Sequence, residues 1–262
     1  MAIGGMRFMV LLVLGVPVLA SAELGATSRL ADWETPEDRE ITRQAAYQSF
    51  HPDHRWRQAG LRAIAEGRLA GARKFFLRSA AYADKAAQAQ YALMLWNGWG
   101  GEVDRGLALA WMELAAEREY RKFVELRDQF RAKVTAEEAK HARDVRDSVF
   151  DEYGDRIAKP RLETVMRRGL RTRTGSRTGS GGTSRVQTFA SLDDARGALG
   201  VGGGATSQTP ELGHFWDAMY WQPTQYWEWQ DTNWEAPGRR GTVTVDPLIP
   251  TGATGEVPRS NQ

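Results

Sequence analysis

The chain lacks cysteine altogether and has only four histidines in 262 residues. Without thiols it forms no disulfide, binds no metal through a thiolate and carries no lipid on an N-terminal cysteine. One stretch has the composition of a metal site: His51 and His54 flank Pro52 and Asp53. The proline breaks the helix that would align the two imidazoles, and no third ligand is evident. We therefore predict that the chain holds no metal and no cofactor.

A strong charge of one sign is also missing. The 35 basic and 33 acidic residues leave a net charge of +2, so no global field directs the chain to nucleic acid. Catalytic motifs are equally scarce, because no serine stands in a nucleophile elbow and no pair of carboxylates shares an apolar setting. The glycine-rich stretch 200–204 does not open a helix after a strand, so it is not a phosphate loop. We predict a protein that is not an enzyme and has no nucleic-acid partner.

Long apolar runs are absent after the N-terminus. Residues 1–22 have the pattern of a secretory signal peptide, with Arg7 in the n-region, an apolar stretch over 8–19 and small residues at 20–22. The alternative is an N-terminal anchor helix. After cleavage before Glu23, no transmembrane span remains. We predict an exported protein, located in the periplasm of a bacterium with two membranes and otherwise secreted.

Helix signals dominate the chain after this point. Thr35 is suited to cap a helix that starts at Pro36, and Pro52 starts another that ends near Gly67. Apolar residues at helical spacing predict further helices over 69–82, 85–96, 105–116, 121–133 and 136–152.

Two later start signals complete the helical region. Thr135 and Glu138 form a capping box, in which each side chain accepts the backbone N–H of the other residue. Pro160 is expected to begin a last short helix, because proline suits the first helical turn.

Composition divides the chain into regions. Residues 172–213 are rich in glycine, serine and threonine, as in a flexible linker, and residues 241–248 alternate as a short strand would. The predicted regions are a signal peptide over 1–22, an N-terminal segment with one helix over 23–53, a helical repeat domain over 54–171, the linker or arm over 172–213, and an aromatic segment of little regular structure with a disordered end over 214–262.

An internal repeat connects two parts of the helical region. Residues 75–81 and 110–116 both end in paired alanines, and the pairs lie 35 positions apart with Phe76 opposite Trp111. Both stretches fall in the second helix of an expected hairpin. A period of about 34 to 36 residues with two helices per unit is typical of tetratricopeptide repeats. The fold class that we predict is all-α, a short α-solenoid of antiparallel helix hairpins.

The second unit, residues 85–119, carries a more specific pattern. Its elements are an Asn-Gly-x-Gly loop, an aspartate, and an alanine, an aromatic residue and an alanine pair in the second helix: Asn97, Gly98, Gly100, Asp104, Ala108, Trp111, Ala115 and Ala116. This pattern resembles the Sel-one-like repeat (SLR) family, a tetratricopeptide relative with a longer inter-helix loop. The chain departs from the family at Tyr91, Ala92 and Leu95, and at Glu119, which stands where the family has glycine. Residues 54–82 form an earlier, degenerate unit without the glycine loop.

The resemblance implies a non-enzymatic scaffold for protein–protein interaction, in which stacked helices grip a protein or peptide. Small residues let helices approach closely and the aromatic residue fills the groove beside them, so the signature residues are expected to be structural. Trp99 lies in the loop and is a candidate partner contact. The alternative is that Trp99 folds back over its own hairpin.

A basic stretch follows the predicted repeats. Between residues 156 and 185, nine lysines and arginines face a single acid, Glu163. Arginines bind phosphates and other anionic groups, and the exported location favours an anionic envelope polymer over nucleic acid. The alternative is a solvated helix face and tail. The arginines that we expect to contact a partner are Arg167, Arg168, Arg171, Arg173 and Arg177.

Aromatic residues crowd the stretch 214–234. This segment docks back onto the helical domain, binds a partner, or stacks exposed rings on a glycan. Trp227 and Trp229 alternate as they would on an extended segment with one face covered. The candidate partner-binding tryptophans are Trp216, Trp221, Trp227, Trp229 and Trp234.

Two functions of different classes follow from these features. The first is a protein–protein interaction scaffold of the bacterial cell envelope, with a protein or peptide partner. The alternative is a binder of an envelope glycan or anionic polymer through the C-terminal aromatics and the arginine-rich arm. Full burial of the aromatics would count against the glycan hypothesis.

Overall fold

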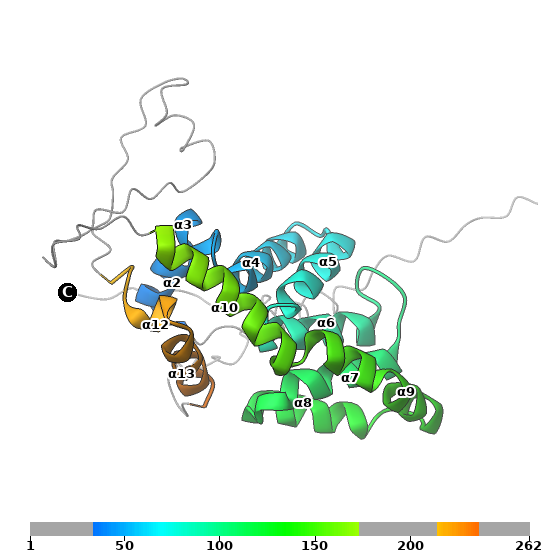
Figure 1. Cartoon of the computed structure of the whole chain (residues 1–262). Coiled ribbons are helices and arrows are strands. Elements are labelled where there is room, and N and C mark those ends of the chain that lie inside the picture. Colours follow the sequence, from blue (N-terminus) through cyan, green and yellow to red (C-terminus); the bar gives the residue numbers. More distant parts are fainter. Residues whose placement is uncertain (1–33, 173–213, 236–262) are drawn as a thin grey trace, which may run out of the picture.

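The computed structural model describes residues 34–172 and 214–235 (Figure 1). Every regular element in these two ranges is a helix, which confirms the all-α class. None of these helices is both long and apolar enough to cross a membrane. The predicted signal peptide, most of the arm, the strand over 241–248 and the disordered end lie outside the described residues.

Short connections join the helices. The helices before residue 173 are α2 (Pro36–Thr42), α3 (Ala45–Gln48), α4 (Pro52–Ala65), α5 (Leu69–Ala80), α6 (Lys85–Asn97), α7 (Arg105–Ala115), the 3-10 helix η2 (Ala116–Arg118), α8 (Arg121–Arg131), α9 (Ala136–Tyr153) and α10 (Asp155–Thr172). The aromatic segment contributes α12 (Ala218–Trp221) and α13 (Pro223–Glu235).

Helices that follow one another in sequence pack against each other. Helix α4 packs on α5, α5 on α6 and α6 on α7, and α7 also contacts α8 and α9 (Figure 1). Small residues permit the close approach, since a Cβ on Gly60 of α4 would lie 2.7 Å from the ring of Phe76 in α5. Ala108 and Ala115 of α7 are fully buried, and Trp111 between them is 3% exposed. These signature residues therefore belong to the core.

Polar caps define where the helices start. Thr35 and Asp38 bond reciprocally at the start of α2, and Thr135 and Glu138 do the same at α9, which confirms both predicted starts. Asp104 caps α7 by accepting a backbone N–H of its first turn at 2.8 Å. Local sequence thus sets these boundaries.

The loop between α6 and α7 requires its glycines. Gly98 and Gly100 have φ angles of 70° and 77°, in the left-handed region. A Cβ on Gly100 would also lie 2.4 Å from the carbonyl oxygen of Leu69, so the loop touches the start of α5. Trp99 folds back onto the apolar cluster of α4, α5 and α6. Glu119 has a φ of 55°, a conformation that suits the glycine of the SLR pattern.

Two expectations about the helices are wrong. Pro160 does not start the last helix but lies inside α10. That helix begins at Asp155, because the carboxylate of Glu117 accepts the Asp155 N–H at 3.0 Å and supplies the missing cap from another part of the chain. The N-terminal segment over 23–53 contains α2, α3 and the first residues of α4 rather than one helix.

The expectation of little regular structure in the aromatic segment is also wrong for residues 214–235. Trp227 and Trp229 lie on α13 rather than on an extended stretch. Both indoles are nearly buried. Packing against the rest of the chain therefore sets the conformation of this segment, which the alternation of two tryptophans does not reveal.

Candidate binding groove

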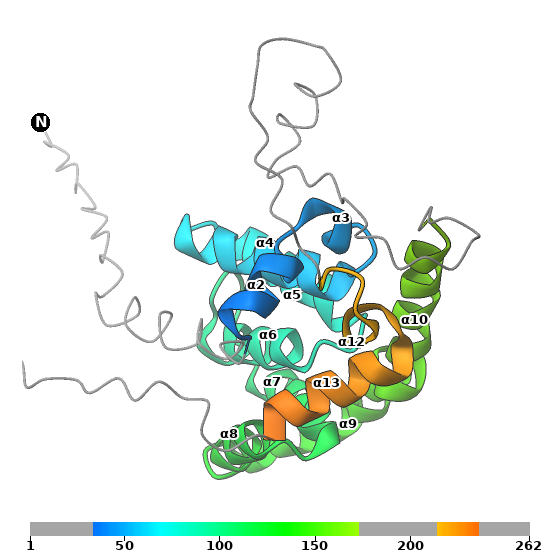
Figure 2. The ribbon, with the colours of Figure 1, turned by 90° about the vertical axis from the view of Figure 1, so that its left-hand side faces the viewer.

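Residues 214–235, called the docked segment from here on, lie across one side of the helical stack. Figure 2 shows α12 beside α10, and α13 running from there towards α8. The surfaces of α2–α4, α8 and α10 that the docked segment covers are called the docking face. The hydrogen bonds between segment and face join residues up to 182 positions apart in sequence.

The tryptophans of the docked segment point inward. Trp221 is 1% exposed, Trp227 and Trp229 are 8% exposed, and Trp216 and Trp234 are partly buried. The three buried indoles, those of Trp221, Trp227 and Trp229, offer no free face to a sugar ring. The segment therefore docks on the helical domain in this structure, one of the three arrangements expected from its sequence.

Two of these indoles meet specific side chains of the docking face. Trp229 stacks on His54, with 6.4 Å between the ring centroids and 19° between the ring planes. Trp227 lies under two cations, with the guanidinium carbon of Arg118 at 4.8 Å and the ammonium of Lys159 at 4.9 Å from the ring centroid. Such cation–π contacts strengthen when they are shielded from water.

Tyrosine hydroxyls anchor the segment to buried carboxylates. Tyr220 donates to Asp38 Oδ1 at 2.8 Å, and Tyr226 donates to Asp53 Oδ2. Asp38 and Asp53 are 4% and 1% exposed. The imidazole of His51 also lies 2.8 Å from the backbone carbonyl of Tyr220. Hydrogen bonds to buried carboxylates are stronger than those between neutral groups, so they fix the position of α12 and α13.

The other end of α13 is held in the same way. Tyr120 donates its hydroxyl hydrogen to Asp231, and its ring stacks on Trp234 at 5.7 Å. Between the two ends, the indole N–H of Trp227 donates to Glu163 of α10 at 3.0 Å. Polar contacts at both ends and in the middle set a single register for the segment.

A buried ion cluster lies beneath the docking face. Arg57 donates to Asp84 at 2.5 Å and to Glu34 at 2.8 Å. Burial raises the pKa of Glu34, but the hydrogen bond and charge of His54 and the charge of Arg57 outweigh this effect and lower the pKa to about 2. Asp84 also caps α6, so the cluster ties the N-terminal segment to the helical stack.

The same region holds buried polar groups that are incompletely paired. Burial lowers the pKa of His51 to about 3, aided by the charge of His54 and opposed by the carbonyls of Tyr47 and Tyr220. A neutral imidazole donates through one nitrogen, so His51 satisfies only one of these two carbonyls at a time. Burial raises the pKa of Asp53. The buried atoms without a hydrogen-bond partner include Tyr47 Oη, Asp53 Oδ1 and His54 Nε2.

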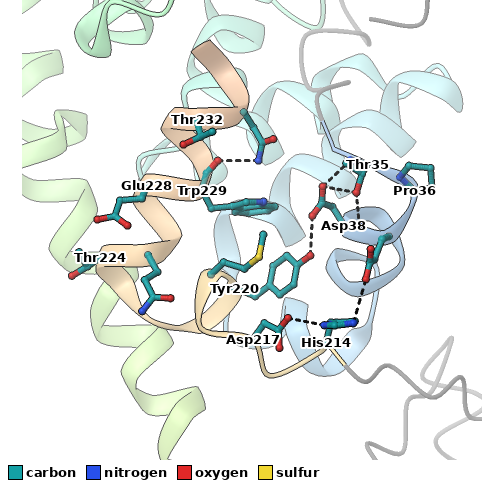
Figure 3. Close-up of a pocket in the computed structure, with 14 residues that line it drawn as sticks. Thr35, Pro36, Asp38, His214, Asp217, Tyr220, Thr224, Glu228, Trp229 and Thr232 are labelled. Atoms are coloured by element: carbon teal, nitrogen blue, oxygen red, sulfur yellow. Dashed lines mark hydrogen bonds and ion pairs between the residues drawn. The ribbon is translucent and has the colours of Figure 1, made fainter. Parts of the chain in front are cut away.

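An open cleft of about 1220 Å³ lies between α2 and the helices α12 and α13 (Figure 3). Its walls carry the carboxylates of Glu37, Asp38, Asp217 and Glu228, together with threonine, glutamine and asparagine side chains. His214 lies 2.9 Å from Asp217, and this hydrogen bond raises the pKa of the imidazole. Carboxylate walls attract cations, so the cleft does not suit an anionic polymer.

Side chains that could hold a metal do not gather in the described residues. Within 34–172 and 214–235, no group of three His, Asp or Glu side chains has the arrangement of a metal site. His51 and His54, the two imidazoles of the metal-like stretch, are both fully buried and contact aromatic rings of the docked segment. Their role in this structure is to contact α12 and α13.

Three of the predicted arginines lie on α10 and two lie outside the described residues. Arg167, Arg168 and Arg171 are exposed on α10, and Arg167 pairs with Glu163 at 2.8 Å. Arg173 and Arg177 fall outside the described residues. Glu163 also accepts the indole N–H of Trp227 at 3.0 Å, so the structure brings Arg167 and Trp227, but not all of the predicted arginines and tryptophans, to one carboxylate.

Sequence patterns did not point to the residues that form the docking face. Asp38, Asp53, Arg57, Asp84 and Tyr120 are all buried, although charged residues on helices usually lie in water. A usable signal was the number of tyrosines in the aromatic segment, because a buried hydroxyl needs an acceptor. That signal does not identify which carboxylates accept.

Comparisons with known proteins give no match: no protein-family model, no curated protein and no solved structure is similar to this chain. The resemblance to the SLR family therefore stays a prediction that depends on the residues of one repeat.

Proposed function

We propose that the chain is a non-enzymatic scaffold for protein–protein interaction in the bacterial cell envelope, built as a short α-solenoid of SLR type. Its cellular location rests on the signal-peptide pattern of residues 1–22. Packing of consecutive helices along α4 to α9 is compatible with a solenoid.

One observation carries the proposal. The docking face holds a polypeptide segment from a distant part of the chain through side-chain hydrogen bonds, ring stacking and cation–π contacts. A surface with these acceptors and rings in fixed positions is suited to recognise an aromatic peptide. Catalysis gains no support from the titratable groups beneath it, because His51, His54 and Asp53 are buried and do not line the cleft.

Site-specific photo-crosslinking tests this function. A benzophenone amino acid replaces Glu37, which is exposed on α2 at the cleft, and in a matched control it replaces Lys140, exposed on α9. In source cells we expect position 37 to crosslink one envelope protein that position 140 does not reach. Equal crosslinking at the two positions, or none at either, contradicts a scaffold with a defined partner site.

The second candidate is binding of an anionic envelope polymer. It rests on the exposed basic side of α10, where no described carboxylate pairs with Arg168 or Arg171. Because Trp221, Trp227 and Trp229 are buried, this function depends mainly on arginine. Cosedimentation with purified cell wall tests it, using the Arg168→Gln/Arg171→Gln variant and Arg121→Gln of α8 as the control. Equal cosedimentation of both variants contradicts this function.

A further inference from the structure

The helical stack and the docked segment have largely separate cores. Two apolar clusters fill the stack, and all their buried members lie between residues 63 and 149. A third cluster combines rings of the docked segment with Ile41, Tyr47, Ala83 and the inner side chains of α10. Removal of the segment would therefore open the third cluster and leave the cores of α4 to α9 in place.

The seam between segment and face is unusually polar. Its contacts include two tyrosine–aspartate hydrogen bonds and a histidine–carbonyl contact. Three of the buried atoms without a hydrogen-bond partner, on Tyr47, Asp53 and His54, belong to side chains that contact the segment. Each unpaired buried polar atom destabilises the docked state, and water would hydrate it once the segment leaves. The seam is thus suited to open.

We propose that the docking face is a binding site for an aromatic segment of a partner protein, and that residues 214–235 occupy this site until the partner displaces them. The inference rests on the proposed scaffold function and names its partner class. Asp38 and Asp53 accept hydroxyls from two tyrosines six positions apart, and His54 stacks on an indole three positions later. A partner that fits presents the same spacing, Tyr-x5-Tyr-x2-Trp.

Covalent attachment gives the chain's own segment an advantage over such a partner. A tethered segment faces its site at an effective concentration on the order of mM. A free peptide of the same sequence therefore binds the intact chain weakly, and it binds far better when the resident segment is weakened. This rise in peptide affinity, when the resident segment is weakened, distinguishes a displaceable segment from a permanent part of the core.

The experiment uses the full chain and a fluorescein-labelled synthetic peptide of residues 214–235, with binding followed by fluorescence anisotropy. Tyr226→Phe in the chain weakens the resident segment but leaves Asp53 free to accept a hydroxyl from the peptide. We expect this chain to bind the peptide roughly 30- to 150-fold more tightly than the natural chain does. The same substitution placed in the peptide should lower its affinity for either chain by a similar factor.

Glu228→Gln provides the control on the same helix, because Glu228 is exposed at the cleft. The control chain should bind the peptide as the natural chain does. Equal affinity of all three chains, or no binding to a folded Tyr226→Phe chain near mM peptide, overturns the proposal. Light scattering on the same samples reports self-association, and a dimer that exchanges segments would make a second copy the occupant and also overturn it.

A second measurement applies if Tyr226→Phe does not fold. The natural chain is cut by protease within residues 173–213, which removes the tether, and is then incubated with excess labelled peptide. Exchange of the peptide for the cut fragment supports the proposal, and complete retention of the fragment overturns it. Peptide exchange without an envelope crosslink at position 37 would refute the scaffold function alone, whereas a crosslink at position 37 that excess peptide does not reduce would refute only the displacement.

Discussion

Tyr226 donates its phenolic hydrogen to Asp53, a residue that lies 173 positions earlier in the chain. The other oxygen of this carboxylate has no partner, so Tyr226 is its principal donor. Tyr220 makes the parallel contact with Asp38, but Asp38 also accepts the backbone N–H and the hydroxyl of Thr35, at 2.8 and 2.7 Å. The two tyrosine–aspartate pairs therefore differ in the number of hydrogen-bond donors that the carboxylate keeps when the tyrosine hydroxyl is removed.

This difference predicts unequal costs for the same substitution. Tyr226→Phe leaves a buried carboxylate without a hydrogen-bond donor and should lower the free energy of unfolding by about 2–3 kcal/mol. Tyr220→Phe leaves Asp38 with its two Thr35 donors and should cost about 1 kcal/mol. Urea denaturation followed by tryptophan fluorescence measures both. Equal midpoints for the two variants would show that Asp53 gains no more from its tyrosine than Asp38 does.

Three glycine-to-alanine substitutions separate backbone strain from steric clash. Gly100 has a left-handed φ, and its Cβ would meet the Leu69 carbonyl at 2.4 Å, so Gly100→Ala should cost at least about 3 kcal/mol. Gly67 has a φ of 74° and open space around it, which predicts a loss of about 1 kcal/mol. Gly71 lies inside α5 with its nearest neighbour at 3.7 Å, so alanine should stabilise by up to about 1 kcal/mol. Thermal melts rank the three, and any other order contradicts this account.

The helices of the repeat region were predictable because their signals are local. Capping residues such as Thr35 and Thr135 act within one helical turn. Gly98 and Gly100 adopt the positive φ angles that the loop between α6 and α7 needs. The start of α10 was not predictable, since its cap is Glu117, which lies 38 positions away. Local sequence cannot show which distant carboxylate reaches a helix end.

The docking face was less predictable for a related reason. The sequence indicates that docking is one of several fates of the aromatic segment, but it does not show which surface accepts it. That surface is made of charged side chains, such as Asp53 and Arg57, whose burial follows from their mutual pairing. Pairing of this kind depends on the assembled fold rather than on the spacing of residues along one helix.

Acid should weaken docking through His51. With the segment bound, burial lowers the pKa of this imidazole to about 3, whereas the ordinary value is 6.5. Between pH 3 and 6.5 the docked state therefore binds fewer protons than the undocked state. The contribution of neutral His51 to docking is fully present above pH 6.5 and decreases as the pH falls towards 3. At pH 5 the docking equilibrium should shift by roughly 30-fold. The emission maximum of the docked tryptophans, recorded against pH, reports the change.

Two histidine variants test whether His51 is the group that titrates. His51→Gln keeps an amide donor for the Tyr220 carbonyl but cannot titrate, so its profile should be flat between pH 4.5 and 6.5. His214→Gln removes an exposed imidazole and should follow the natural chain. The stabilisation from Glu34, whose pKa is about 2, is present above about pH 4.5 and is lost as the pH falls through 2, below this window. A natural chain with no transition above pH 4.5 would contradict the role of His51.

Lys85 joins three parts of the helical stack at a buried position. Its ammonium donates to Glu117 Oε2 at 2.7 Å and to the Leu114 carbonyl at 3.1 Å, and lies 3.0 Å from Asp155 at the start of α10. Burial lowers the pKa of this lysine, and the charge of Asp155 opposes the effect. Lys85→Met removes the charge while nearly keeping the volume, and it leaves Glu117 with less compensation. We expect a loss of about 3–5 kcal/mol in the free energy of unfolding.

The matched control is Lys140→Met on α9. Lys140 pairs with Asp144 at 2.8 Å, a distance similar to that of the Lys85–Glu117 pair, but both side chains are exposed. Water and ions screen such a pair, so its loss should leave the urea midpoint nearly unchanged. Since Glu117 also caps α10, Lys85→Met should in addition speed hydrogen exchange at the start of α10, while the control should not. Equal midpoints for the two variants would mean that burial adds nothing to the Lys85 pair, and that α10 is held by Arg118 and Asp155 alone.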